Sequence, residues 1–358
     1  MTKLYLNDTN GLKEARLGDT HVENSKELQK NCIDFLCENL IVADPAKTFF
    51  AQSTSAHVAN ISRLIKRTSP HLTTLYISDH EIRWIKEMLE IPGYQPDSTR
   101  SNYRANEPVH SETFDLRMFA FHELIETINK AEGPAIFYVS HASRLTGELT
   151  DIAAAFALIK RLHPESLFIV DGAQTLGALS PFTCNEVCDV YLSMSCKFLG
   201  AEPNIGLAFM SDDFYERYVG RPESYPVFDI ALYSRDIFSL WQNLQHPRFR
   251  EDYQTHIESL KSYAVEQIMK IDSSILHISP SQAPNFLTLN LGSVDDNKKF
   301  VAYAEKEGVQ IDDNVNPLWS LIDPPVPLVR IGLSVRAEKE DVDRLVRVVE
   351  SYKQKTPR

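Results

Sequence analysis

The sequence has little of what marks membrane, secreted or nucleic-acid-binding proteins. It contains no apolar run long enough to span a bilayer, and its first residues lack the layout of a signal peptide. Its five cysteines form no regular framework, which is typical of a reducing compartment. The formal net charge of −12 disfavours nucleic acid, because phosphate binding needs a basic surface. We therefore expect a cytoplasmic protein with neither membrane nor nucleic-acid partners.

Two further classes lack support. No Gly-x-Gly-x-x-Gly motif follows a predicted strand, which disfavours a nicotinamide enzyme. Cys184 and Cys188 are spaced like a helical metal pair, but no third and fourth ligand follows at metal-site spacing, so no metal site is predicted. What is present is 358 residues, 43% hydrophobic and 24% charged, enough for a substantial core and for two domains.

Short runs of β-branched and aromatic residues alternate with amphipathic segments. In these runs both the odd and the even positions are apolar, as in strands whose two faces are both covered by other parts of the protein. They comprise residues 48–52, 74–78, 135–140, 167–170, 190–193 and 206–210. Residues 151–160 form the clearest amphipathic segment between them. The alternation predicts an α/β fold: a large, doubly wound, mainly parallel sheet.

The last third of the chain has a different pattern. Polar residues 92–112 and the aromatic stretch 220–249 are predicted to form loops, and a charged helix over 250–270 leads out of the large domain. Strands are expected at 285–290 and 328–333, and helices at 298–307 and 338–352. We predict a large domain over 13–249 and a small α+β domain over 250–358, with residues 1–12 as an N-terminal arm belonging to the latter.

Polar side chains follow four of the predicted strands. Asp171 ends one run and Lys197 lies just beyond the next, although lysine is seldom buried without a partner. Ser53-Thr54-Ser55 precede an apolar helical rhythm, which offers an N-cap and an anion site, and His80 follows residues 74–78. In open α/β sheets ligands bind beyond the carboxyl ends of the strands, so we expect these groups to converge.

One cofactor, pyridoxal 5′-phosphate (PLP), needs all of these groups. It has a phosphate, an aldehyde that condenses with lysine, a pyridine nitrogen that pairs with a carboxylate, and a ring face for stacking. A carboxylate about 4 Å from that nitrogen would stabilise its proton by roughly 4 kcal/mol at an effective dielectric of about 20, or about three pKa units.

The order of these groups resembles the class V aminotransferase family of fold-type I PLP enzymes. The resemblance rests on residues 168–174, 193–197 and 203–206 and extends over most of the chain. The family includes cysteine desulfurases, kynureninases, isopenicillin-N-epimerase-like enzymes, aminotransferases and lyases. It implies a homodimer with its active site at the subunit interface.

The resemblance also implies a role for each residue. Lys197 would form the Schiff base and move protons, and Asp171 would pair with the ring nitrogen. His80 would stack on the ring, and Gln174 would bind its phenolic oxygen. The phosphate would be held by Ser53, Thr54 and Ser55, helped by Ser193 or Ser195 and by Cys196. Ser234 would reach the phosphate of the partner subunit. Arg330 would clamp the substrate carboxylate.

The sequence departs from the family pattern at three places. Cys196 stands where the family frequently has histidine, and Arg144 stands where an asparagine lies near the ring oxygen, which suggests a second substrate-binding cation. The Gly-Pro that usually follows the lysine is replaced by Gly200-Ala201-Glu202-Pro203. No cysteine follows Cys196, so a persulfide-forming desulfurase is disfavoured.

These features predict a PLP enzyme that transforms an α-amino acid through an external aldimine and an α-carbanion. An aminotransferase is the leading interpretation. A kynureninase-like or β-eliminating lyase, or a decarboxylating enzyme, shares the same first steps, and an epimerase is a third possibility. A non-catalytic scaffold is disfavoured by the joint presence of Lys197, Asp171 and Arg330.

Overall fold

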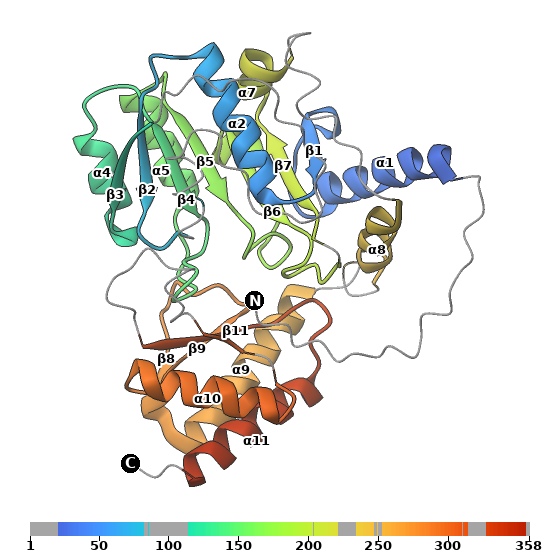
Figure 1. The fold of residues 1–358 in the computed structure, drawn as a ribbon, viewed down its shortest axis with the longest axis vertical. Helices are drawn as coiled ribbons and strands as arrows, with labels where there is room; N and C mark the ends of the chain where they lie inside the picture. Colours follow the sequence, from blue (N-terminus) through green and yellow to red (C-terminus); the bar gives the residue numbers. More distant parts are fainter. Residues whose placement is uncertain are drawn as a thin grey trace.

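The computed structural model describes residues 21–81, 85, 114–202, 204–220, 234–246, 249, 253–309, 311–313 and 327–355. The predicted arm 1–12, the predicted loop 92–112 and residues 221–233 of the second predicted loop lie outside the described residues. Within the described part, two sheets form the framework (Figure 1).

The larger sheet has seven strands in the order β1-β7-β6-β5-β4-β2-β3. The strands are β1 (Thr48–Ala51), β2 (Thr74–Ser78), β3 (Asp115–Phe119), β4 (Ile136–Ser140), β5 (Leu167–Asp171), β6 (Val190–Met194) and β7 (Gly206–Met210). The five strands from β6 to β3 run parallel, whereas β7 is antiparallel to both β6 and β1. The predicted mainly parallel sheet is thus confirmed, and all six predicted runs are strands.

Strand β3 was missed by the sequence analysis. It lies at the edge of the sheet and pairs with β2, and four of its five residues are at least partly exposed. Its sequence Asp-Leu-Arg-Met-Phe therefore lacks the doubly apolar run by which the buried strands were found.

Helices cover the large sheet on both faces, because its strands are apolar on both parities. Tyr138 and Ile169 pack with the apolar side of α2 (Thr54–Thr68), whereas Phe137 and Phe168 belong to the core on the opposite face. That second face is covered by α1 (His21–Asn39), α4 (Leu124–Lys130), α5 (Ile152–Leu162) and α8 (Ser234–Leu244). Helix α8 lies within the stretch 220–249, which the sequence analysis had assigned to a loop.

The smaller sheet is antiparallel, with the order β10-β11-β9-β8. Its strands are β8 (Leu276–His277), β9 (Phe286–Asn290), β10 (Asp312–Asp313) and β11 (Leu328–Gly332). Helices α9 (Tyr253–Asp272), α10 (Val294–Lys306) and α11 (Lys339–Lys355) pack against it (Figure 1). The chain also forms the short helices α6 (Cys184–Val187) and α7 (Asp212–Phe214), a π-helical turn at Tyr215–Val219, and 3-10 turns at Pro45–Lys47, Phe121–Glu123 and Ser273–Ile275.

The small sheet joins the large one through its polar face. Leu287 and Leu289 of β9 enter the common apolar core, whereas Thr288 lies on the other side of the strand. The Thr288 hydroxyl donates to the Thr146 carbonyl at 3.3 Å, and the neighbouring Arg330 of β11 donates to the Arg144 carbonyl at 2.8 Å. Both acceptors lie in the loop that follows β4, so the two sheets meet at the carboxyl end of the parallel strands.

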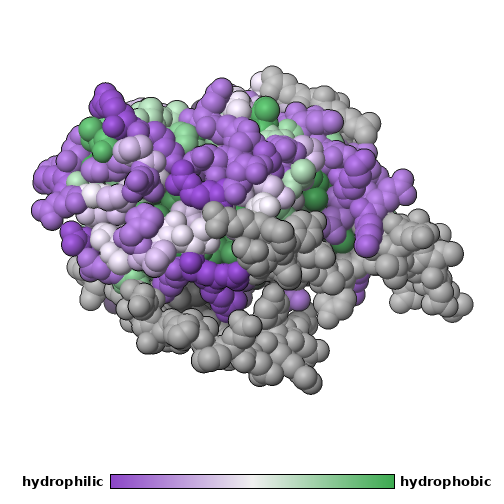
Figure 2. All heavy atoms as spheres, turned by 90° about the horizontal axis from the view of Figure 1, so that it is seen from above, coloured by the Kyte–Doolittle hydropathy of each residue, from purple (hydrophilic) through white to green (hydrophobic). Residues whose placement is uncertain are grey.

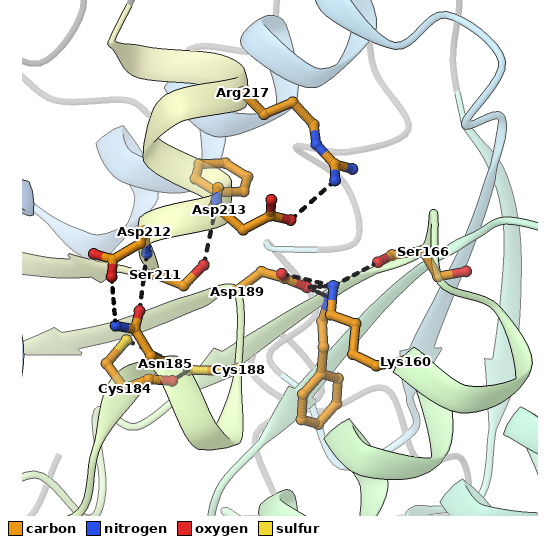
Figure 3. A network of polar contacts seen from close by, with 12 residues as sticks. Lys160, Ser166, Cys184, Asn185, Cys188, Asp189, Ser211, Asp212, Asp213 and Arg217 are labelled. Carbon is orange, nitrogen blue, oxygen red and sulfur yellow. Dashed lines mark hydrogen bonds and ion pairs between the residues drawn. The ribbon is translucent and has the colours of Figure 1, made fainter.

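An ion pair between a partly exposed lysine and a buried aspartate braces the opposite end of the parallel strands (Figure 3). Asp189 precedes β6 and its side chain is only 2% exposed. The Lys160 ammonium of α5 lies 2.7 and 2.9 Å from the two carboxylate oxygens of Asp189. The Phe168 backbone N–H donates to the same carboxylate at 2.7 Å. Lys160 also donates to the Ser166 carbonyl at 3.1 Å. This network ties α5 to the starts of β5 and β6.

The face viewed in Figure 2 is largely hydrophilic, with small and scattered apolar areas. Among the described residues, no helix is both long and apolar enough to cross a membrane.

Replacing Lys160 tests the bracing ion pair. Lys160→Met leaves the Asp189 carboxylate buried without its cation, so we expect a loss of about 3–5 kcal/mol in the free energy of unfolding. Lys130→Met is the matched control, because Lys130 pairs with Glu126 on the exposed surface, where ion pairs add little to stability. Urea unfolding measures both; equal losses would contradict the assigned role.

Candidate functional site

The candidate site lies where β2, β4, β5 and β6 end. Asp171 is the last residue of β5, and its Cα is opposite Ser140 of β4 and Leu192 of β6. Lys197 follows β6 by three residues, and His80 follows β2 by two. Parallel strands direct their carboxyl ends to one edge of the sheet, which explains how residues so far apart in sequence converge.

Asp171 is a buried carboxylate that its surroundings hold firmly. It is 7% exposed; its Oδ1 accepts from the Ala173 N–H at 2.8 Å, and its Oδ2 accepts from the Tyr138 hydroxyl at 3.4 Å. Burial raises its pKa, while the Ala173 N–H, the charge of Lys197, the Tyr138 hydroxyl and the charge of Arg144 each oppose that rise. The charge of Lys197 lowers the pKa of Asp171, so the lysine and the carboxylate lie close enough to act on one another.

Gly172 lets the chain turn closely after Asp171. A Cβ at this position would lie 1.9–2.1 Å from ring and hydroxyl atoms of Tyr191. The Tyr191 hydroxyl is held in place by Thr175 at 2.8 Å and by Nδ1 of His141 at 3.0 Å. The backbone after β5 is therefore fixed by close packing against the next strand.

Lys197 lies half-buried in a turn after β6. The Gly200 N–H donates to its carbonyl at 3.1 Å, and Gly200 itself has φ +67°, a conformation that favours glycine. The Ala201 N–H donates to the Ser195 carbonyl at 2.9 Å, a second bond across the same turn. Gly200 is thus required by the turn that presents the lysine.

The hydroxyl cluster forms the N-terminus of α2. Ser53 is the N-cap, and its Oγ accepts from the Ala56 N–H at 3.2 Å. Thr54 donates to the Ser193 carbonyl at 2.9 Å, which ties the helix start to β6. Ser55, like Thr54, is buried. The predicted N-terminus is confirmed, and its first-turn N–H groups form the kind of site that binds anions.

Gly206 allows this helix start to sit directly on β7. A Cβ on Gly206 would lie 2.3 Å from both the carbonyl carbon and the oxygen of Ser53. The buried His57 ring reaches the Gly206 carbonyl at 3.2 Å, and burial lowers its pKa to about 4. The hydroxyl cluster is consequently held at a fixed height above the sheet.

His80 is oriented from two sides. Its Nδ1 lies 2.7 Å from the Ser143 hydroxyl, and its ring stacks on Phe121 with centroids 4.9 Å apart and an interplanar angle of 8°. Burial lowers its pKa, opposed by the charges of Asp79 and Glu148. Because Phe121 occupies one face, a ligand ring stacked on His80 has to use the other.

The two arginines are buried at the junction of the sheets. Arg330 is 3% exposed and lies over the Phe286 ring, 5.5 Å from its centroid, in addition to its bond to the Arg144 carbonyl. Arg144 is 6% exposed, and its charge lowers the pKa values of Asp171 and Glu81. Arg144 is therefore a neighbour of the carboxylates, and its assignment to substrate stays a prediction.

The remaining predicted residues occupy varied surroundings. Ser193 donates to the Gly172 carbonyl at 3.3 Å, and the Ser195 hydroxyl accepts from the Ile205 N–H at 2.8 Å. Cys196 is buried 3.8 Å from the Met194 sulfur, and the Gln174 carbonyl accepts from the Asn285 side chain at 2.9 Å. Ser234 begins α8, and its side chain lies outside the described residues. These contacts leave the predicted cofactor roles untested.

Sequence reasoning missed two buried groups at this site. Glu81 directly follows His80 and is 1% exposed. Tyr138 belongs to β4, and its hydroxyl donates to the Asp171 carboxylate at the end of β5. The sequence Asp79-His80-Glu81 directly after β2 could have pointed to Glu81, because two acidic residues at the end of an apolar strand are unusual. Nothing pointed to Tyr138, because it is one aromatic residue within an apolar strand.

No family model and no curated protein matches this sequence. Solved structures do match. A NifS-like protein aligns with 98% of this chain and 93% of its own, at 14% identity and a TM-score of 0.68. A mutant of C-DES with glycine covalently linked to its PLP cofactor covers 94% of this chain and 89% of its own, at 15% identity and a TM-score of 0.70.

An aspartate aminotransferase of subgroup IV from Thermus thermophilus is also similar, with 95% and 94% coverage, 15% identity and a TM-score of 0.67. The chain therefore has the fold-type I architecture that the sequence analysis predicted. At such low identity the likeness establishes the fold, and the activity has to be argued from the site residues.

A methyl group at Gly206 tests how the start of α2 is held. Gly206→Ala forces Ser53 away from β7, so we expect a loss of about 1–3 kcal/mol in the free energy of unfolding, as for other overpacked cores. Gly332→Ala is the control, because a Cβ there meets no atom within 4 Å. Chemical denaturation of the two variants measures this difference, and a Gly206→Ala variant as stable as the control would contradict the close approach.

Proposed function

We propose that this chain is a PLP-dependent enzyme that transforms an α-amino acid. The observation that carries the proposal is the placement of Lys197 and Asp171 beyond neighbouring strands, with the lysine charge acting on the buried carboxylate. PLP supplies an aldehyde that a primary amine can occupy and a protonated ring that withdraws electrons. The aldehyde needs a primary amine such as that of Lys197, and the protonated ring needs a carboxylate such as that of Asp171.

The residues present fit such a cofactor. The N-terminus of α2, capped by Ser53, offers N–H groups and a positive dipole end to a phosphate. Asp171 is buried and held by the Ala173 N–H, so its carboxylate is pre-oriented for a cationic partner. His80 offers an aromatic face with its plane fixed by Phe121.

The chain's own groups then divide the work. The Lys197 amine holds the cofactor and afterwards takes and returns the proton at the substrate's α-carbon. Asp171 keeps a positive charge at the ring nitrogen favourable. We propose that Arg330 binds the substrate carboxylate from the face of the small sheet, where its guanidinium is already oriented by the Arg144 carbonyl.

Aminotransfer is the reaction that we propose. The fold is shared with an aspartate aminotransferase of similar length, and no cysteine follows Cys196 to serve as a persulfide carrier. Lyase, decarboxylase and epimerase reactions use the same Lys197 and Asp171 and are the alternatives. A homodimer in the cytoplasm remains part of the proposal.

Spectroscopy of the purified protein tests the cofactor. We expect a visible absorption band that borohydride bleaches and that Lys197→Ala abolishes, whereas Lys130→Ala, which removes an exposed lysine, retains it. Asp171→Asn should keep the band and lower kcat by roughly 10²–10³-fold, the equivalent of two to three pKa units of lost charge stabilisation. A colourless protein that takes up no added PLP would refute the proposal.

Single-turnover mixing with α-amino acids tests the reaction type. Transamination should accumulate pyridoxamine phosphate and release a keto acid in equal amounts. Release of alanine, pyruvate or sulfide without pyridoxamine phosphate would instead identify a lyase, and loss of optical activity alone an epimerase.

A further inference from the structure

A second buried carboxyl group lies beside Asp171. Glu81 belongs to the turn after β2 and is 1% exposed, so its side chain is as buried as the surrounding core. The Ser140 hydroxyl donates to its Oε1 at 2.6 Å. The Cα of Ser140 is directly opposite that of Asp171 in the register of β4 and β5, so the serine that binds Glu81 is the cross-strand neighbour of Asp171.

Within the part of the chain that the structure describes, two cations act on these two carboxyl groups. Arg144, from the loop after β4, acts on both, and Lys197, from the turn after β6, acts on Asp171. Tyr138 of β4 donates to Asp171, and burial and the charges of both carboxyl groups raise the pKa of this phenol. Two adjacent carboxylates in a region of low dielectric do not both ionise readily, so one of them retains a proton.

The contacts decide which carboxyl group holds that proton. Asp171 receives the Ala173 N–H, the Tyr138 hydroxyl and the charge of Lys197 in addition to that of Arg144. Glu81 receives the Ser140 hydroxyl and N–H and the charge of Arg144. Burial, together with the charge of Asp171, raises the pKa of Glu81 to about 8. Asp171 therefore has more donors and cations than Glu81 to stabilise its ionised form, and Glu81 is the carboxyl group that keeps a proton more readily.

We infer that Glu81 is a positioning residue of the proposed PLP site: it acts through Asp171 and sets how much negative charge faces the cofactor ring. This inference rests on the proposed function. While it is protonated, Glu81 leaves Asp171 as the single negative charge of the pair, facing Arg144 and Lys197. A cationic ring beside Asp171 would favour the ionised form of Glu81, because opposite charges close together stabilise one another.

Glu81→Gln tests this role, since the amide keeps the size of the side chain and cannot ionise. The first readout is the pH midpoint of the visible band of PLP bound through Lys197. Removing a nearby negative charge weakens proton binding by the cofactor, so we expect the midpoint to fall by roughly one pH unit. Glu186→Gln is the control, because Glu186 is an exposed glutamate of α6 outside this cluster, and its midpoint should match the wild type.

The second readout needs no cofactor. The ordinary pKa of a glutamate is 4.5, and that of folded Glu81 is about 8. Between these values the folded state binds the extra proton, so the free energy of unfolding of the wild type should fall as pH rises from about 4.5 to 8. Glu81→Gln lacks this contribution, so its stability relative to the wild type should increase across the same range and level off above it.

Ser140→Ala provides a second variant if Glu81→Gln fails to fold. Loss of the hydroxyl removes a donor that lowers the pKa of Glu81, so the decline in stability should extend to higher pH than in the wild type.

The outcomes separate this inference from the proposed function. A wild type with a PLP band and a Glu81→Gln variant with an unchanged midpoint would overturn the inference and leave the cofactor in place. A wild type that binds no PLP would overturn both. An unchanged dependence of unfolding on pH in Glu81→Gln and Ser140→Ala would show that Glu81 does not hold the proton.

Discussion

The burial of the Asp171 carboxylate at the end of β5 is the constraint on which the rest of the site depends. Burial raises its pKa, so the ionised form persists only because donors and cations converge on it. Those partners come from four places: the backbone of Ala173, the phenol of Tyr138, the turn that carries Lys197, and the loop that carries Arg144. The elements around the sheet's edge are thus arranged around one charge.

The same need for partners links the two sheets. Arg144 serves the carboxylates with its side chain, while its carbonyl accepts from Arg330 of the small sheet. The Thr146 carbonyl accepts from Thr288 of β9 and from Gln282, which precedes that strand, so these bonds also hold the loop after β4. The junction of the two sheets and the candidate site therefore share the loop after β4.

Much of this arrangement could be predicted from particular residues. The doubly apolar runs around Phe137, Phe168 and Tyr191 predicted the central strands, because each parity faces a separate core. Ser53 predicted a helix start, and Asp171 and Lys197 predicted the site because charges rarely follow buried strands. Edge strand β3 and helix α8 were not found: the former exposes most of its residues, and the latter lies in an aromatic stretch interpreted as a loop.

The sequence by itself determined the order of the strands along the chain, the residues that follow them, and the type of chemistry that those residues allow. Only the tertiary structure decided which charges act on one another. Glu81 and Asp171 are separated by 90 positions, and nothing in their spacing shows that Ser140 binds the one and is the cross-strand neighbour of the other. Proximity of this kind depends on strand register and on a shared low-dielectric interior, and both exist only after the chain has folded.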